Sequence, residues 1–199
     1  MRLMLERWGP HAANGLTATR VVLTPVFSLA VWFAERSWLL GVSAVAMFAV
    51  VAATDVLDGR VARRWRTASH AGRVFDHLAD VGFLVLALST YVGLGLAPWW
   101  VPASIVGSFG VYVIDSWLRP TPVAPNVIGS RIGHVGGVCN YVLVGVLVCN
   151  NSARIHLLSP AFLSLLFCLV PLYSGGAVAA RLLTRREPLP VAQLATTPE

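Results

Sequence analysis

Four of the five Asp residues of the chain lie within one stretch of 26 positions, DVLDGRVARRWRTASHAGRVFDHLAD. They are Asp55, Asp58, Asp76 and Asp80. The spacings of three and four residues place each pair on one face of a helix. Four carboxylates this close, near a region of low dielectric constant, repel one another unless positive charge lies among them. The pattern therefore indicates a site that gathers cations.

Two sources of positive charge are open. Five arginines within the stretch would form a lattice of salt bridges, but surface pairs contribute little and do not require such clustering. They are Arg60, Arg63, Arg64, Arg66 and Arg73. Ligation of a hard divalent cation by carboxylate oxygens explains the cluster better, and paired cations about 3.5 to 4 Å apart recur in phosphoryl transfer. We therefore favour metal binding.

The stretch has the form D-x2-D-G-x2-A-R-x8-G-x3-D-x3-D, and it resembles the signature of the CDP-alcohol phosphatidyltransferase family at all eight specified positions. These positions are Asp55, Asp58, Gly59, Ala62, Arg63, Gly72, Asp76 and Asp80. The segment NGLTATRVVLTPVF, which begins at Asn14, is similar to the segment that opens the first span in bacterial members. The family implies six spans and transfer of a phosphatidyl group from a CDP-linked lipid, usually CDP-diacylglycerol, to an alcohol, with release of CMP.

The resemblance also implies roles for individual residues. Asp55, Asp58 and Asp76 would hold one divalent ion, Mg²⁺ or Mn²⁺, and Asp55, Asp76 and Asp80 would face a second. Asp80 would also be the catalytic general base that takes the proton of the acceptor hydroxyl. The expected substrate contacts are Gly59, Ala62, Arg63, Ser69, Gly72, Asn14, Thr17, Arg20 and Arg131.

Several basic residues have alternative interpretations. Arg20 lies in an apolar run, where it suits either a phosphate contact or a side chain that extends to the membrane interface. Asp115 and Arg119 are four residues apart, and we expect a structural ion pair there rather than acceptor binding. By charge and predicted depth, Arg131 and Arg181 are a hypothetical site for the phosphate of a phosphorylated acceptor.

The rest of the chain is strongly apolar. Of its 199 residues, 56% are hydrophobic and 12% are charged, a composition far from that of a soluble domain. Apolar runs long enough to cross a bilayer recur six times, over residues 15–34, 38–56, 75–97, 100–118, 134–150 and 155–172. The predicted fold is therefore an all-α polytopic membrane protein with six transmembrane helices, preceded by a short amphipathic helix over residues 2–8.

The arginines predict the orientation. Twelve of the fifteen fall in segments that the six spans place on one side of the membrane. The positive-inside rule therefore puts both termini and the Asp-rich stretch in the cytoplasm, and the resemblance implies the bacterial inner membrane. Anionic lipid headgroups account for the net charge of +6, so we expect no nucleic-acid partner.

One domain is expected over residues 1–186, followed by a disordered tail over 187–199. Cys139, Cys149 and Cys168 are odd in number and fall within spans, which argues against a disulfide framework or a zinc site. Small residues within the spans, such as Gly41 and Gly145, allow close helix approach. The sequence indicates no interface, although members of the family are often dimers, so a homodimer stays open.

The acceptor is the least determined feature. The segment DHLADV departs both from D-P-x-A-D-K, frequent in bacterial phosphatidylglycerophosphate synthases, and from D-S-L-A-D-V followed by F-G-x-A-P, frequent in phosphatidylserine synthases. Glycerol 3-phosphate is slightly favoured; serine, an inositol phosphate or another polyol stay open. A transporter or channel is disfavoured because the acids cluster at one edge, and an inactive scaffold because the Asp set is complete.

Overall fold

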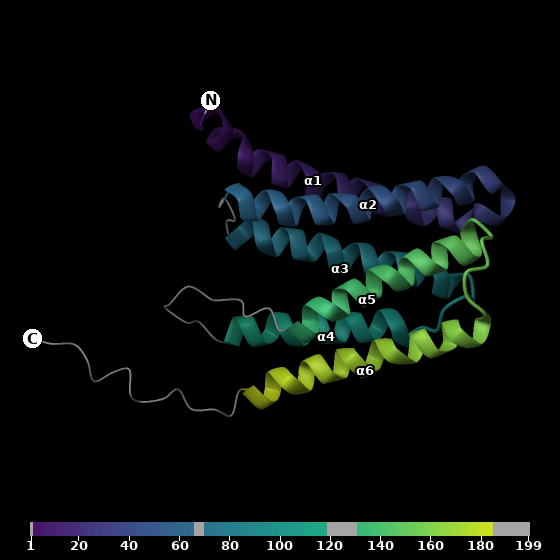
Figure 1. Ribbon diagram of the computed structural model, residues 1–199. Helices are drawn as coiled ribbons and strands as arrows, with labels where there is room; N and C mark the ends of the chain where they lie inside the picture. The colour runs from purple at the N-terminus through teal and green to yellow at the C-terminus, as the bar shows by residue number, and fades with distance from the viewer. Residues whose placement is uncertain (1, 66–69, 119–130, 185–199) are drawn as a thin grey trace, which may run out of the picture.

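The computed structural model describes residues 2–65, 70–118 and 131–184, with side chains at 15, 17–55, 75–115 and 135–183. The described chain is helical and contains no strand. Its helices are α1 (Arg2–Trp32), α2 (Trp38–Trp65), α3 (His70–Gly93), α4 (Trp100–Leu118), α5 (Arg131–Leu147) and α6 (Pro160–Thr184), shown in Figure 1. A 3₁₀ turn, η1 (Ala34–Arg36), joins α1 to α2, and a π-helical turn, η2 (Val148–Ser152), continues α5.

Four segments of the described chain are long and apolar enough to cross a membrane. They are Trp38–Asp55, Phe75–Gly93, Val135–Ser152 and Pro160–Leu183. Shorter apolar helices cover Thr17–Trp32 and Trp100–Asp115. Many large apolar side chains are exposed on this bundle, among them Leu39, which is 69% exposed. Such an exterior suits lipid rather than water, and the prediction of an all-α polytopic membrane protein is confirmed.

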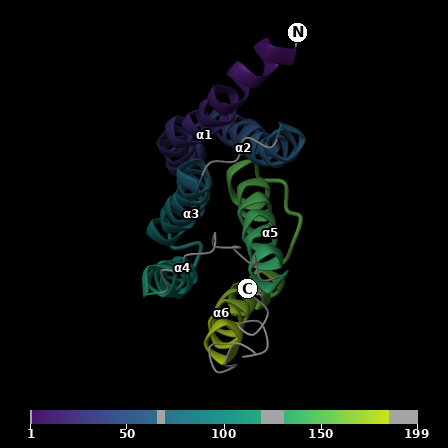
Figure 2. The same cartoon turned by 90° about the vertical axis from the view of Figure 1, so that its left-hand side faces the viewer.

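The helices form three layers of two, seen nearly end-on in Figure 2. In this view α1 and α2 form the top layer, α3 and α5 the middle layer, and α4 and α6 the bottom layer. Helix α1 packs against α2 and α3, whereas α6 packs against α4 and α5. The start of α1, the end of α2 and the start of α3 lie at the same end of the bundle (Figure 1). The acidic pairs on α2 and α3 therefore belong to one end.

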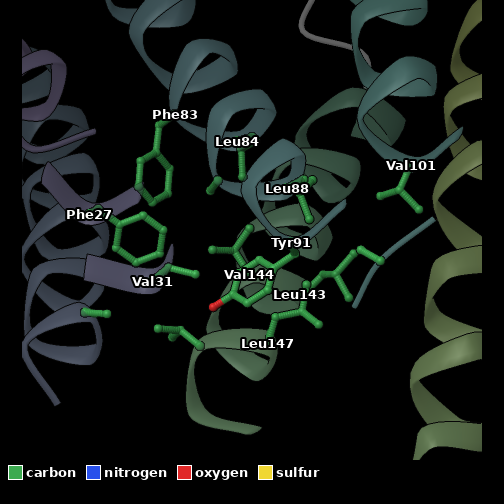
Figure 3. Packing of buried hydrophobic residues seen from close by; sticks show 14 of the residues in the cluster. Phe27, Val31, Phe83, Leu84, Leu88, Tyr91, Val101, Leu143, Val144 and Leu147 are labelled. Carbon is green, nitrogen blue, oxygen red and sulfur yellow. The ribbon is translucent and has the colours of Figure 1, made fainter. Parts of the chain in front are cut away.

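All six helices contribute to the core, and Figure 3 shows its part around α1, α3 and α5. Phe27 of α1, Phe83 and Tyr91 of α3, and Val144 of α5 are fully buried. The rings of Phe27 and Phe83 lie 5.3 Å apart at an interplanar angle of 53°. This packing fixes the spacing of α1 and α3, because close-packed side chains leave little room for adjustment.

Two glycines of the spans lie where another element comes close. A Cβ atom on Gly41 of α2 would lie 1.9 Å from the Ser152 carbonyl oxygen of η2. A Cβ atom on Gly145 of α5 would lie 2.8 Å from the ring of Phe48 on α2. The absence of a side chain thus permits these approaches, as expected from the small residues in the sequence.

Several helix boundaries differ from the sequence-based expectation. Helix α2 ends at Trp65 rather than at residue 56, and α3 begins at His70 rather than at residue 75. Helix α1 runs without a break from Arg2, so the segment expected as a separate surface helix is continuous with the first span. Elongation of a formed helix costs little compared with nucleation of a new one, which explains the continuity.

The last helix begins at Pro160, five residues later than expected, and extends to Thr184. Pro160 suits the first helical position because it has no N–H to satisfy. Just before it, Ser159 accepts hydrogen bonds at its carbonyl oxygen from the N–H groups of Phe162 and Leu163, over 3.0 and 3.1 Å. The tail predicted for residues 187–199 lies outside the described residues.

Candidate active site

The acidic residues of the signature lie on two helices. Helix α2 continues to Trp65 and α3 begins at His70, so all four signature Asp residues are helical. Asp55 and Asp58 lie three residues apart on α2, whereas Asp76 and Asp80 lie four residues apart on α3. Each pair therefore shares a helix face, as the spacing predicts.

Arg20 of α1 lies among three of these carboxylates. Its Nη1 atom lies 3.2 Å from Asp76 Oδ1, and its Nη2 atom lies 3.6 Å from Asp55 Oδ1. Nη1 also donates to Asp80 Oδ1. A single guanidinium thus links α1 to both acidic helices.

The position of Arg20 differs from an interfacial one. Its side chain is fully buried, whereas those of Asp55, Asp76 and Asp80 are 39%, 38% and 21% exposed. A charge so deeply buried is tolerated when opposite charges surround it. The alternative of a side chain extending to the interface is therefore wrong for this structure.

Two hydroxyl groups also donate to these carboxylates. Thr17 of α1 donates through Oγ1 to Asp76 Oδ1 over 3.3 Å. Tyr141 of α5 donates through its hydroxyl to Asp80 Oδ1 over 3.2 Å. Side chains from four helices, α1, α2, α3 and α5, therefore meet at this point.

Some predicted site residues have described backbone but no described side chain. Asn14 belongs to α1; Asp58, Gly59, Ala62 and Arg63 belong to α2; Gly72 belongs to α3; Arg131 is the first residue of α5. Ser69 lies outside the described residues. The side chains of the five arginines within the Asp-rich stretch, the alternative source of positive charge, are likewise outside the described set. The structure therefore tests none of the contacts predicted for them.

A second polar cluster, the Arg181 cluster, lies on α4 and α6. It consists of Arg181, Asp115 and Tyr112. Arg181 Nε donates to Asp115 Oδ2 over 2.5 Å, and its guanidinium carbon lies 4.5 Å from the centre of the Tyr112 ring. Asp115 thus has a partner on α6; Arg119, its predicted partner, lies outside the described residues.

The Arg181 cluster connects to the acidic helix through an aromatic contact. The rings of His77 on α3 and Tyr112 on α4 lie 5.5 Å apart, and His77 directly follows Asp76. Arg181 was expected just beyond the last span, but it lies inside α6 because that helix extends to Thr184. The cluster therefore belongs to the same end of the bundle as the signature Asp residues.

Sequence reasoning did not identify Tyr141. A tyrosine within an apolar span was the available signal, because a buried phenolic hydroxyl usually requires a hydrogen-bond partner. The spacing between residues 80 and 141 gives no indication of their contact. Only the packing of α5 near α3 brings the hydroxyl to Asp80.

Among the described side chains, no three His, Cys, Asp or Glu residues are arranged so that they could hold one metal ion. Asp58, a predicted ligand, is not among those side chains. The described carboxylates are instead arranged around Arg20. Their oxygen atoms are of the kind that hard divalent cations bind.

Comparison with known proteins identifies the class. A model of the CDP-alcohol phosphatidyltransferase family matches residues 10–179. The chain belongs to this family, and the resemblance of its signature is confirmed. It is thus an integral membrane enzyme of the phosphatidyltransferase class.

Individual relatives are consistent with this assignment. The chain is 32% identical over 148 residues to a probable phosphatidylglycerophosphate synthase of Mycobacterium tuberculosis, covering 73% of this chain and 69% of the relative. It is 34% identical over 139 residues to a CDP-diacylglycerol–glycerol-3-phosphate 3-phosphatidyltransferase of Yersinia enterocolitica. This match covers 68% of this chain and 71% of the relative. A protein of the same name from Salmonella paratyphi A is 32% identical over 124 residues, which cover 60% of this chain and 66% of the relative.

Proposed function

We propose that this enzyme transfers the phosphatidyl group of CDP-diacylglycerol to glycerol 3-phosphate and releases CMP. The observation that carries the proposal is the approach of Asp55, Asp76 and Asp80, from two helices, to one point at one end of the bundle. The names of the Yersinia and Salmonella relatives support this donor and this acceptor.

The residues suit divalent cations in their chemistry. Among the described side chains, three carboxylates face one guanidinium, so additional positive charge would reduce their mutual repulsion. We assign one ion, Mg²⁺ or Mn²⁺, to Asp55, Asp58 and Asp76. We assign a second to Asp55, Asp76 and Asp80, whose side chains surround Arg20 in this structure and would have to change their arrangement to hold it. When bound, such ions would neutralise the diphosphate and stabilise the departing CMP.

Asp80 is assigned the role of general base. The acceptor hydroxyl oxygen forms a bond to the phosphorus of the phosphatidyl group, while the bond from that phosphorus to the CMP oxygen breaks. The hydroxyl proton passes to the Asp80 carboxylate, and the bonding electron pair leaves with CMP. Asp80 is the least exposed of the three described carboxylates, and two side chains orient it.

The nucleotide and the donor phosphates are assigned to the signature helices and α1. Small residues on α2, Gly59 and Ala62, would let the nucleotide approach the backbone. Arg63 suits bidentate contact with phosphate oxygens. The remaining proposed substrate contacts are Ser69, Gly72, Asn14, Thr17 and Arg20. The contacts of Thr17 and Arg20 with Asp76 support the inclusion of α1 in this set.

The acceptor phosphate is assigned to Arg131 and Arg181. Arg131 begins α5 and Arg181 lies in the last turn of α6, two helix ends on the same side of the bundle as the signature Asp residues (Figure 1). Arginine suits this role because its planar guanidinium binds phosphate oxygens in pairs.

The active end is placed in the cytoplasm, in the inner membrane of a bacterium. The excess of arginines on the segments at that end supports this orientation. A single catalytic domain over residues 1–186 and a homodimer are further parts of the proposal, and the match of residues 10–179 to one family supports the first of them.

The proposal is tested with purified protein in nanodiscs that contain CDP-diacylglycerol. CMP release is measured with Mg²⁺ or Mn²⁺ and with glycerol 3-phosphate, serine, inositol phosphate or another polyol. We expect release that requires glycerol 3-phosphate, disappears with EDTA and falls to a small residual rate in Asp80→Asn. Glu35→Gln is the matched control because it removes an exposed acid at the opposite end of the bundle.

The other outcomes are equally informative. Release with serine or inositol phosphate alone would retain the reaction and replace the acceptor. No release with any acceptor from a folded protein would overturn the proposed reaction. Full activity of Asp80→Asn would remove the assignment of the base.

A further inference from the structure

Tyr141 reaches the signature carboxylates from a helix that carries none of them. It lies on α5, and its hydroxyl donates to Asp80 Oδ1 over 3.2 Å. The eight specified positions of the family signature lie on α2 and α3. The contact therefore adds a residue from outside the signature to the environment of Asp80.

The ring of Tyr141 is held by aromatic packing. It stacks on Phe83 of α3 with ring centres 5.7 Å apart and an interplanar angle of 19°. Phe83 lies three residues after Asp80, about one helical turn away on a neighbouring position of the same face. Phe83 also lies 5.3 Å from Phe27 of α1 and 6.4 Å from Phe48 of α2, measured between ring centres. Four helices thus fix the direction in which the tyrosine hydroxyl points.

The described hydrogen bonds of Asp80 are all made to one of its two carboxylate oxygens. Oδ1 accepts from Tyr141 and from Arg20. Among the described residues, no hydrogen bond is made to Oδ2. Two donors from different helices on one oxygen restrain rotation of the carboxylate about its Cβ–Cγ bond, so the direction of Oδ2 is also restrained.

We propose that Tyr141 is a positioning residue for the phosphatidyl transfer: it fixes Oδ1 of Asp80 so that Oδ2 is directed toward the acceptor hydroxyl. This role rests on the proposed function, in which Asp80 takes the acceptor proton. A general base must lie within hydrogen-bond reach of the proton that it removes. A carboxylate that rotates freely about its Cβ–Cγ bond would spend less time in this geometry than one that Tyr141 holds in place. Tyr141 exchanges no atom with the substrate and acts through Asp80 alone.

The test is Tyr141→Phe, which removes the hydroxyl and keeps the ring that stacks on Phe83. We expect kcat to fall about 10- to 100-fold, the range for loss of a hydrogen bond to a charged group. The KM values for CDP-diacylglycerol and glycerol 3-phosphate should stay within about twofold, because neither binding surface changes. Mn²⁺ binding, followed by electron paramagnetic resonance without substrate, should also stay within about twofold.

Tyr91→Phe is the matched control. Tyr91 is a fully buried tyrosine of α3 whose hydroxyl lies 3.1 Å from Ser152 Oγ, away from the signature. Its substitution should lower the thermal midpoint and leave kcat unchanged. If both variants lose kcat in proportion to their thermal midpoints, Tyr141 is structural and the proposal is wrong.

A double-mutant cycle tests whether Tyr141 acts through Asp80 or independently of it. In the Asp80→Asn background, Tyr141→Phe should cause no additional loss of residual turnover, because the residue acts through Asp80. An additional 10-fold loss in that background would contradict the proposal. Unchanged kcat of Tyr141→Phe beside an active wild type overturns only this role, whereas an inactive wild type overturns the proposed function and this role together.

Discussion

Arg20 Nη1 lies 3.2 Å from Asp76 Oδ1, so a fully buried positive charge of α1 faces an acidic residue of α3. The same guanidinium reaches Asp55 and Asp80. The acidic end of the bundle is therefore assembled around a residue that lies more than thirty positions before the signature. Substitution of Arg20 is expected to affect the assembly of the helices as well as any contact with substrate.

Arg20→Met should lower the thermal midpoint and make it more dependent on divalent cations. Removing one partner of a buried ion pair costs about 3 to 5 kcal/mol, but partial exposure of Asp55 and Asp76 permits screening by water. We therefore expect a loss in the range of about 1 to 3 kcal/mol. Added Mg²⁺ should raise the midpoint more in the variant than in the wild type, as measured by thermal denaturation in detergent.

Arg36→Met is the control for this substitution. Arg36 is exposed at the other end of α1, where its guanidinium carbon lies 4.8 Å from the centre of the Phe33 ring. Its replacement should leave both the midpoint and the response to Mg²⁺ unchanged. Equal responses of Arg20→Met and wild type to Mg²⁺ would show that Arg20 is not the counter-charge of the carboxylates.

Arg181→Met should raise the KM for glycerol 3-phosphate about 10-fold, the effect of losing about 1.4 kcal/mol of binding free energy. The reason is the proposed contact between the guanidinium and the acceptor phosphate. Asp115 and the Tyr112 ring orient that guanidinium through the 2.5 Å hydrogen bond and the 4.5 Å ring contact. Steady-state kinetics with each substrate varied in turn should show an unchanged KM for CDP-diacylglycerol.

Arg154→Met provides the comparison, because Arg154 lies at the opposite end and donates to the Glu35 carbonyl oxygen over 3.2 Å. It should leave both KM values unaltered. A lowered thermal midpoint of Arg181→Met with an unchanged KM for the acceptor would identify the Arg181 cluster as a structural ion pair.

Local patterns predicted what depends on local structure. The spacing of the Asp pairs placed them on helix faces, and the apolar runs predicted the helices, with α4 at the expected residues. The partners of these residues were not predicted, because the contacts of Arg20 and Tyr141 span 35 to 61 positions and depend on how the helices pack. The start of α6 was also misplaced, since hydropathy alone does not distinguish an apolar loop from an apolar helix.

The loop before α6 provides a prediction about stability. Asn150 is buried and makes three hydrogen bonds to this loop. Its Oδ1 atom accepts from the N–H groups of Leu157 and Leu158 over 2.6 and 3.0 Å. Its Nδ2 atom donates to the Leu158 carbonyl oxygen over 2.8 Å. Asn150→Ala leaves these backbone groups without partners, at a cost of about 2 to 4 kcal/mol. Thermal denaturation should show a clear fall in the midpoint.

The adjacent Asn151→Ala is the matched control. Asn151 is only partly buried, and no hydrogen bond of its side chain occurs among the described residues. Its midpoint should stay close to that of the wild type. If both variants lost the same stability, the three bonds of Asn150 would not be the cause.

The contact between α2 and η2 should be intolerant of even one methyl group. In Gly41→Ala the new Cβ atom would lie 1.9 Å from the Ser152 carbonyl oxygen, so α2 and η2 must separate. Overpacking of this kind typically costs about 1 to 3 kcal/mol, which offsets the usual gain from replacing glycine within a helix. Gly107→Ala on α4 is the control because a Cβ atom there would meet no heavy atom within 4 Å. A lower thermal midpoint for Gly41→Ala, beside an equal or higher one for Gly107→Ala, is the expected result; equal midpoints would show that α2 and η2 can move apart at no cost.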